Sequence, residues 1–470
     1  MRNHSVSLSG AEPTQLDALL NGIVRRYRLT EIGPTSWPLD SAQPATTLAL
    51  DIERAREASA RGEAPDAACR LRFLHTLARL IGDAMHPDSG DPAFQAMVLR
   101  HRAACVGEYA SLSAHAEQDR RRIRTDVAAL AHPAKLDRAP AGVRRSLLAR
   151  LHVAASAARP GELRVAVQAL LDLPDIAADA SLHEALARLQ RGAPLERLER
   201  LQALEQDERV RRYRSLWDRQ GPPPGSAEAA ARGARSRARG ASAETSAAQA
   251  LGALARRLNQ LDAGRAEYAV VTSMRVPATI PGSAARAKSE WDAVLLRRAR
   301  PGAAASAWDV CLLVEAKSSV DAAATDFPRL LRGVRLLACA DADVEYAFGT
   351  REGEVRLRGA SLAALRTDEA ALRRSILYCC DAPAEPAPRL LSAAGRMQLL
   401  TAPTSLSFAA RLDEGFLAEP AELEPVWKEL LSSPRWATVL NQYPMLRQVR
   451  ELMVHPHDLL AVAGDAADRR

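Results

Sequence analysis

Three charged residues occur where strand-forming segments could bring them together. Asp292 lies in the apolar segment Trp291–Leu296, and Glu315 and Lys317 follow the apolar segment Trp308–Val314. Residues two apart in an extended strand point to the same face, so Glu315 and Lys317 share one face. If the two strands are neighbours, Asp292 comes beside Glu315, and two carboxylates offer the oxygen ligands that Mg²⁺ prefers. An ammonium group beside them can orient an attacking water or neutralise a phosphate.

Lysine is rare in this chain, which makes its position informative. Of the 64 basic residues only four are lysine, namely Lys135, Lys288, Lys317 and Lys428. The chain therefore uses arginine wherever a general positive charge is sufficient. Lys317 is the one lysine with an acidic residue two positions before it, and it ends the clearest buried-strand run.

The elements around these residues follow a definite order between residues 242 and 350. A helix with apolar Leu251, Leu254 and Leu258 precedes the strands, and a helix that we expect to be capped by Asp326 follows them. The predicted strands are Tyr268–Val276, Trp291–Leu296, Trp308–Val314, Val344–Phe348 and Val355–Leu357. This order, with an aspartate on one strand and Glu-x-Lys on the next, resembles the restriction-endonuclease-like core of the PD-(D/E)XK nuclease superfamily.

The resemblance implies a metal-dependent nuclease that hydrolyses phosphodiester bonds of DNA or, less favoured, RNA. It implies Asp292, Glu315, Lys317 and the helix acid Glu244 as catalytic residues, with Lys317 assisting the attack of water. The implied cofactor is Mg²⁺, with Mn²⁺ as an alternative, and the implied metal site comprises Asp292, Glu315 and Ala316. Trp291 replaces the proline of the family's name, and no Gln-x-x-x-Tyr motif follows in the next helix.

Further polar residues near the motif are candidates for nucleic-acid binding. Arg329, Arg332 and Arg335 recur at spacing three on the polar face of the second helix, and Lys288 and Ser318 flank the strands. Such residues can contact phosphates beside a nuclease site, and Lys288 could alternatively support the site residues without touching the substrate. They also have ordinary structural roles, since arginines solvate a helix face and a serine after a strand can cap a turn. Equally, Glu244 can stabilise a helix N-terminus and the Asp-Glu-Lys set can be a surface ion pair.

The net charge of +7 permits binding to nucleic acid without requiring it. The excess is concentrated in one stretch from Arg209 to Gly240, which holds nine arginines against Asp218 and Glu228. Within this stretch, residues 221–240 combine Pro-Gly clusters with small residues and arginines. This composition is typical of a flexible basic linker.

The sequence predicts an α+β multidomain protein. Residues 1–218 read as an α-helical domain, followed by a linker at 219–240 and a nuclease-like α/β core with a mixed central sheet at 241–380. Residues 381–470 read as a mixed extension that packs on the core, with strands at 397–400 and 405–409.

The remaining signals limit the class of protein. No segment approaches a membrane span and the N-terminus lacks an apolar signal region, so we expect a cytoplasmic protein with no membrane partner. No Cys-x-x-Cys, Walker A or Gly-x-Ser-x-Gly motif occurs. Two alternatives to an enzyme stay open: a non-catalytic nuclease-fold module for nucleic-acid binding or assembly, and a helical interaction scaffold or effector. The helical half could bind a protein partner, and the sequence leaves the oligomeric state open.

Overall fold

The computed structural model describes residues 14–29, 43–138, 140–222, 225–262, 264–299, 307–385 and 388–464. The chain forms two compact units. We call residues 1–73, 224–396 and 429–470 the sheet unit, and residues 74–223 and 397–428 the helical unit. Together they give the α+β class that the sequence predicts, with helices throughout the described part of the N-terminal half. Pro223 and Pro224 of the predicted linker lie outside the described residues.

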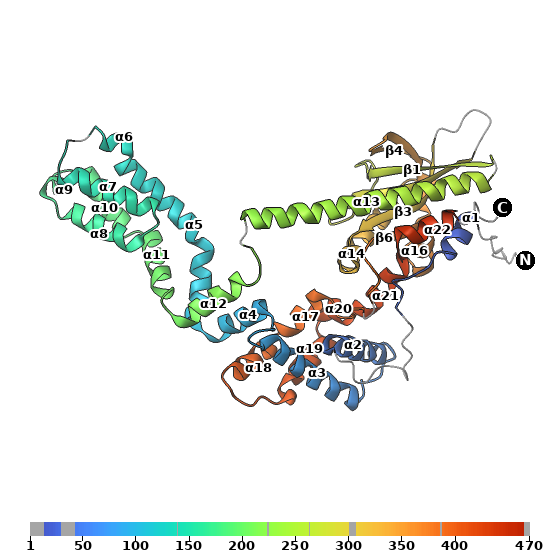
Figure 1. The fold of residues 1–470 in the computed structure, drawn as a ribbon, viewed down its shortest axis with the longest axis horizontal. Coiled ribbons are helices and arrows are strands. Elements are labelled where there is room, and N and C mark those ends of the chain that lie inside the picture. Colours follow the sequence, from blue (N-terminus) through green and yellow to red (C-terminus); the bar gives the residue numbers. More distant parts are fainter. Residues whose placement is uncertain are drawn as a thin grey trace, which may run out of the picture. The chain divides into compact units, whose positions relative to one another are not determined.

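The sheet unit is built on one mixed sheet of seven strands (Figure 1). The strands are β1 (Ala266–Arg275), β2 (Glu290–Ala299), β3 (Asp309–Lys317), β4 (Glu345–Thr350), β5 (Gly353–Arg358), β6 (Ile376–Cys380) and β7 (Met453–Val454). Their order across the sheet is β5-β4-β1-β2-β3-β6-β7. β1, β2 and β3 pair antiparallel, whereas β3 and β6 pair parallel. The five predicted strands correspond to β1–β5, and β6 was not predicted.

Helices cover both faces of this sheet. On one face, α13 (Ala227–Leu261) packs Leu251, Leu254 and Leu258 against alternate residues of β2, β3 and β6. On the other face, α14 (Val320–Leu337) packs Phe327 and Leu330 against the intervening residues. A strand that is buried on both faces reads as a continuous apolar run, which is why β3 was easy to recognise.

The other helices are mostly short. Before α13 lie α1 (Gln15–Asn21), α2 (Pro44–Ala60), α3 (Ala67–Met85), α4 (Pro92–Arg102), α5 (Ala104–Ala131), α6 (Pro133–Leu136), α7 (Val143–Ser156), α8 (Pro160–Leu171), α9 (Pro174–Ala177), α10 (Ala180–Gln190), α11 (Ala193–Leu204) and α12 (Glu208–Asp218). After α14 lie α15 (Gly359–Ala363), α16 (Glu369–Ser375), α17 (Ala393–Leu400), α18 (Pro403–Asp413), η1 (Pro420–Leu423), α19 (Glu424–Ser432), η2 (Pro434–Trp436), α20 (Ala437–Leu440), α21 (Gln442–Leu452) and α22 (Pro456–Gly464). Within the described ranges, no helix is both long and apolar enough to cross a membrane.

Much of the predicted flexible linker is helical instead. Residues 227–240 form the first turns of α13, and Ser226 caps them by accepting a hydrogen bond from the backbone N–H of Ala229 at 3.1 Å. The prediction gave too much weight to glycine. Alanine and arginine are among the strongest helix formers, and Gly233 and Gly240 each cost only about 1 kcal/mol relative to alanine.

The predicted domain boundaries also differ from the observed units. Part of the predicted N-terminal helical domain belongs to the sheet unit, because Leu20 and Ile23, at and just beyond the end of α1, are buried in the same core as α13. The predicted C-terminal extension is divided, since residues 397–428 belong to the helical unit. The strands predicted at 397–400 and 405–409 are wrong. Ser405, Phe408 and Ala409 are the buried residues of α18, and their spacing of three and four is helical.

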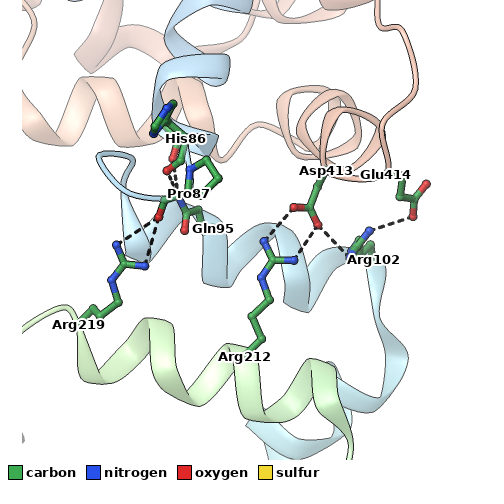
Figure 2. Close-up of polar contacts among 9 residues, drawn as sticks. His86, Pro87, Gln95, Arg102, Arg212, Arg219, Asp413 and Glu414 are labelled. Atoms are coloured by element: carbon green, nitrogen blue, oxygen red, sulfur yellow. Dashed lines mark hydrogen bonds and ion pairs between the residues drawn. The ribbon is translucent and has the colours of Figure 1, made fainter.

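The helical unit joins segments that are far apart in sequence through arginine ion pairs (Figure 2). Asp413 at the end of α18 accepts Arg102 of α4 at 2.9 Å and Arg212 of α12 at 3.0 Å. Arg219 donates to the backbone oxygen of Pro87 at 3.4 Å. Some arginines of the basic stretch 209–240 are therefore used inside the fold.

Candidate functional site

The pairing of β2 with β3 brings the predicted residues together. Ala293 of β2 lies opposite Val314 of β3 in this antiparallel pair. Their neighbours Asp292 and Glu315 therefore lie side by side on the two strands. One Asp292 oxygen, Oδ2, accepts a hydrogen bond from the backbone N–H of Ala316 at 2.8 Å. The same bond fixes Asp292 beside β3. The sequence prediction that Asp292 lies beside Glu315 is therefore confirmed.

Glu315 is the centre of the site and is almost completely buried, with 3% of its side chain exposed. Its Oε1 accepts a hydrogen bond from Lys317 Nζ at 2.6 Å, and its Oε2 forms an ion pair with Lys288 Nζ. Burial and the nearby charge of Asp292 raise the pKa of Glu315 to about 7, against the opposing effect of the two lysines. Glu315 is therefore a carboxyl group whose charge depends on its two cations.

Lys317 bridges two carboxylates. Besides Glu315 it contacts Asp326 Oδ2 on α14 at 3.4 Å, and 19% of its side chain is exposed. Burial tends to lower the pKa of Lys317, but Glu315 and Asp326 outweigh it and the pKa is raised above the ordinary value of 10.5. Lys317 thus carries a positive charge that is held at the rim of the site.

Lys288 takes the supporting one of the two roles that the sequence analysis left open, and not the phosphate contact. Only 5% of its side chain is exposed. Its Nζ contacts Glu315 and lies 3.9 Å from Asp292 Oδ1. Its backbone N–H donates to the oxygen of Arg329 at 3.2 Å. Lys288 is therefore a buried part of the site, and its ammonium group is not available to a phosphate in this arrangement.

Two residues of the site were not predicted, Asp326 and Tyr378. The expectation that Asp326 caps a helix is wrong, because the cap of α14 is Ser319 and Asp326 lies two turns inside the helix, where it faces Lys317. The position of Asp326 next to Phe327, which belongs to the apolar stripe of α14, was the available signal. Tyr378 of β6 is the register partner of Glu315.

The Tyr378 hydroxyl is buried and forms no hydrogen bond within the described part of the chain. Burial raises the pKa of Tyr378, and the nearby carboxylates Asp326, Glu315 and Asp292 act in the same direction. The hydroxyl is therefore a neutral donor that lies beside three acidic groups. We call Asp292, Glu315, Asp326, Lys288 and Lys317 the carboxylate–lysine cluster.

Glu244 reaches the site from the other side. It is exposed on α13 and lines a cleft of about 550 Å³ together with Asp292. The cleft is lined by Ala241, Glu244, Thr245, Ala248, Gln249, Gly252, Arg256, Thr272, Ser273, Asp292, Arg351 and Glu352. Asp292 thus faces both the cleft and the buried Lys288 ammonium group.

The remaining candidates lie around the cluster with separate contacts. Ser318 is exposed directly after β3. Arg329 pairs with Asp326 at 3.7 Å, Arg332 donates to the backbone oxygen of Arg286 at 2.9 Å, and Arg335 is exposed. Arg329 is therefore tied to the cluster, whereas Arg335 has the exposure of an ordinary solvated helix face.

The donor set of the site is two carboxylates that share a cation. In the ranges that the structure describes, no three His, Cys, Asp or Glu side chains are grouped so that they could hold a metal ion. The Ala316 N–H donates a hydrogen bond to Asp292, whereas a metal ion would bind the Ala316 carbonyl oxygen, so the metal-binding role of Ala316 stays a prediction. Asp292 and Glu315 both face the Lys288 ammonium group.

No protein-family model matches this chain, and neither a curated protein nor a solved structure matches it.

Proposed function

We propose that the sheet unit is a metal-dependent nuclease that hydrolyses phosphodiester bonds, with DNA favoured over RNA. The observation that carries the proposal is the placement of Asp292 on β2 beside Glu315 and Lys317 on β3. The order α13-β1-β2-β3-α14, with β6 following after β4, β5, α15 and α16 and pairing parallel to β3, supports assigning a restriction-endonuclease-like fold to this unit. An incidental Glu-x-Lys on a scaffold predicts separated carboxylates, whereas both carboxylates here face one ammonium group.

The site suits Mg²⁺, or Mn²⁺ as an alternative, because the Lys288 ammonium group marks a position where a cation meets both carboxylates. Asp292 and Glu315 would hold the metal ion. When bound, the ion would stabilise the negative charge that develops on the phosphate during hydrolysis.

The protein's own residues perform the other tasks in this proposal. Glu315 and Asp326 hold the Lys317 ammonium group in place at 2.6 and 3.4 Å, so that it presents a fixed positive charge to the attacked phosphate or to a water molecule. Arg256 and Arg351 line the cleft that reaches Asp292, and we assign them to the phosphates of the bound strand.

Cleavage assays with the purified full-length chain test the proposal. Supercoiled plasmid, linear duplex, single-stranded DNA and RNA are incubated with Mg²⁺, Mn²⁺ or EDTA. We expect metal-dependent cutting, and we expect Asp292→Asn and Lys317→Met each to lower the rate by about 10²-fold or more. Lys135→Met, which replaces an exposed lysine of α6, is the matched control and leaves the rate unchanged.

A non-catalytic nucleic-acid-binding module is the second candidate. It is favoured by the same Lys288 ammonium group, which already neutralises the carboxylates without a metal ion. This candidate predicts that no substrate is cut and that the wild type and both site variants bind nucleic acid equally. That combination of results would contradict the nuclease proposal.

A further inference from the structure

The Lys288 ammonium group occupies the place between the two carboxylates of the proposed metal site. Nζ forms an ion pair with Glu315 Oε2 and lies 3.9 Å from Asp292 Oδ1. With 5% of the side chain exposed, solvent does not compete for these contacts to any great extent. A cation of the protein itself therefore takes the position that the nuclease proposal gives to a metal ion.

The surroundings fix Lys288 in this position. Its backbone N–H is bonded to the oxygen of Arg329 on α14 at 3.2 Å. Gly333, one turn further along the helix, leaves room for it, since a Cβ on Gly333 would come within 2.8 Å of Lys288 Cβ. The ammonium group also lies 5.6 Å from the centre of the Trp291 ring. Lys288 is thus packed between β2 and α14 and is not a surface side chain that reaches the carboxylates by chance.

The charges of the cluster make this position consequential. The formal charges of Asp292, Glu315 and Asp326 exceed those of Lys288 and Lys317 by one negative charge. A divalent cation that binds to the carboxylate–lysine cluster is attracted by a net charge of only about one negative unit, and it is repelled by the Lys288 ammonium group at contact distance. Without the Lys288 charge, two negative charges remain, which match a divalent cation.

We infer that Lys288 is an internal counter-cation that competes with the metal ion, so that metal binding requires its ammonium group to leave the carboxylates. This inference rests on the proposed function for the identity of the ligand, a hard divalent cation. Lys288 is here a positioning residue, which sets the affinity for the metal and keeps the metal-free site neutralised. The side chain is long and flexible, so it can move aside while its backbone stays bonded to α14.

Direct measurement of Mn²⁺ binding tests this inference without any nucleic acid. Free Mn²⁺ is measured by electron paramagnetic resonance during titration of the full-length wild type and of Lys288→Met. We expect Lys288→Met to bind Mn²⁺ about tenfold more tightly or better, since it removes a like charge at the site. Lys288→Arg keeps the charge and is expected to bind Mn²⁺ no more tightly than the wild type. Lys135→Met, a substitution in the helical unit, is expected to bind Mn²⁺ as the wild type does.

A second substitution shows where the gained affinity arises. Adding Asp292→Asn to Lys288→Met removes one carboxylate and is expected to abolish the gain. Circular dichroism and a thermal transition confirm that each variant is folded, and Lys288→Gln, which keeps a polar side chain of similar length, replaces Lys288→Met if the latter unfolds. Equal or weaker Mn²⁺ binding by a folded neutral variant overturns the inference.

The outcomes also separate this inference from the nuclease proposal. If the neutral variant gains Mn²⁺ affinity but no form of the protein cuts nucleic acid, the counter-cation stands and the nuclease proposal fails. If the wild type cuts with metal and the neutral variant gains no affinity, the nuclease proposal stands and Lys288 is a structural ion pair only.

Discussion

Asp413 and Glu315 are each held by two cationic side chains, and the cations differ. Asp413 in the helical unit binds two arginines, which are 21% and 49% exposed. Glu315 in the sheet unit binds two lysines, which are 5% and 19% exposed. Half of the four lysines in the chain therefore meet at one buried carboxyl group.

The two kinds of cation suit different tasks. Arginine has a rigid fork that binds carboxylates at fixed angles, and at Asp413 it joins three helices of the helical unit. Lysine is a compact point charge on a flexible stem, so it can be displaced or can follow a reacting group. Asp413 with Arg102 and Arg212, which we call the arginine cluster, stabilises the packing of helices. The carboxylate–lysine cluster has the composition of a site for chemistry.

The largest expected effect comes from removing both lysines. In Lys288→Met/Lys317→Met, Glu315 loses both partners while it stays buried, and we expect the free energy of unfolding to fall by about 3–5 kcal/mol at pH 8. Urea denaturation of the full-length chain measures this loss. An unchanged midpoint for the sheet unit would mean that Glu315 is not held by these lysines.

The pH dependence of stability gives a smaller effect that isolates Glu315. Its pKa is raised to about 7 from the ordinary value of 4.5, so between these values the native state binds more protons than the unfolded state. The contribution of Glu315 to stability therefore falls as the pH rises from about 4.5 to about 7, by on the order of 1 kcal/mol per pH unit at most.

Glu315→Gln removes this dependence and serves as the reference. The wild-type free energy of unfolding, measured relative to Glu315→Gln at several pH values, should decrease through this window. A difference that increases with pH would show that the lysines lower the pKa of Glu315 below its ordinary value.

The smallest effect is expected at the arginine cluster. Asp413→Asn leaves Arg102 and Arg212 partly exposed to water, so we expect a loss of about 1 kcal/mol or less in the stability of the helical unit. Raising the salt concentration to ~1 M should reduce the difference from wild type, because exposed charges are screened. Glu414→Gln is a matched control, and its loss should be smaller still because Glu414 is 46% exposed. A loss as large as that of the double lysine variant would remove the distinction between the two clusters.

The sequence was sufficient for the parts of the site that depend on local patterns. Alternation along two apolar strands placed Glu315 and Lys317 on one face, and strand adjacency placed Asp292 beside them. Tyr378 could not be found in this way. Its strand, β6, is a fully buried run of five residues, and such short runs do not distinguish a strand from a helix segment. The alignment of Tyr378 with Glu315 depends on the parallel pairing of β6 with β3, which are separated in the chain by the elements from α14 to α16.

For Lys288, local patterns left a supporting role and a phosphate contact open and could not decide between them. Lys288 lies just before β2, where alternation no longer defines a face, and its position depends on Arg329 and Gly333 of α14. The linker was misjudged because glycine and arginine content was read as flexibility, although alanine dominates the propensity of residues 227–240. Contacts between segments distant in sequence thus determined most of what the sequence could not predict.

The two ends of the long helix α13 are expected to open at different rates. Its buried residues begin at Ala243, whereas the residues from Ala227 to Ser242 are exposed or half-buried, so within the described part of the chain these turns depend mainly on their own hydrogen bonds and on the Ser226 cap. Such turns open and close within about a microsecond, because helix–coil exchange of unsupported segments is fast. The turns that pack on the sheet, from Ala243 onward, open only when the core of the sheet unit opens. One continuous helix therefore contains an arginine-rich end that opens rapidly and a packed end, beginning beside Glu244, that opens slowly.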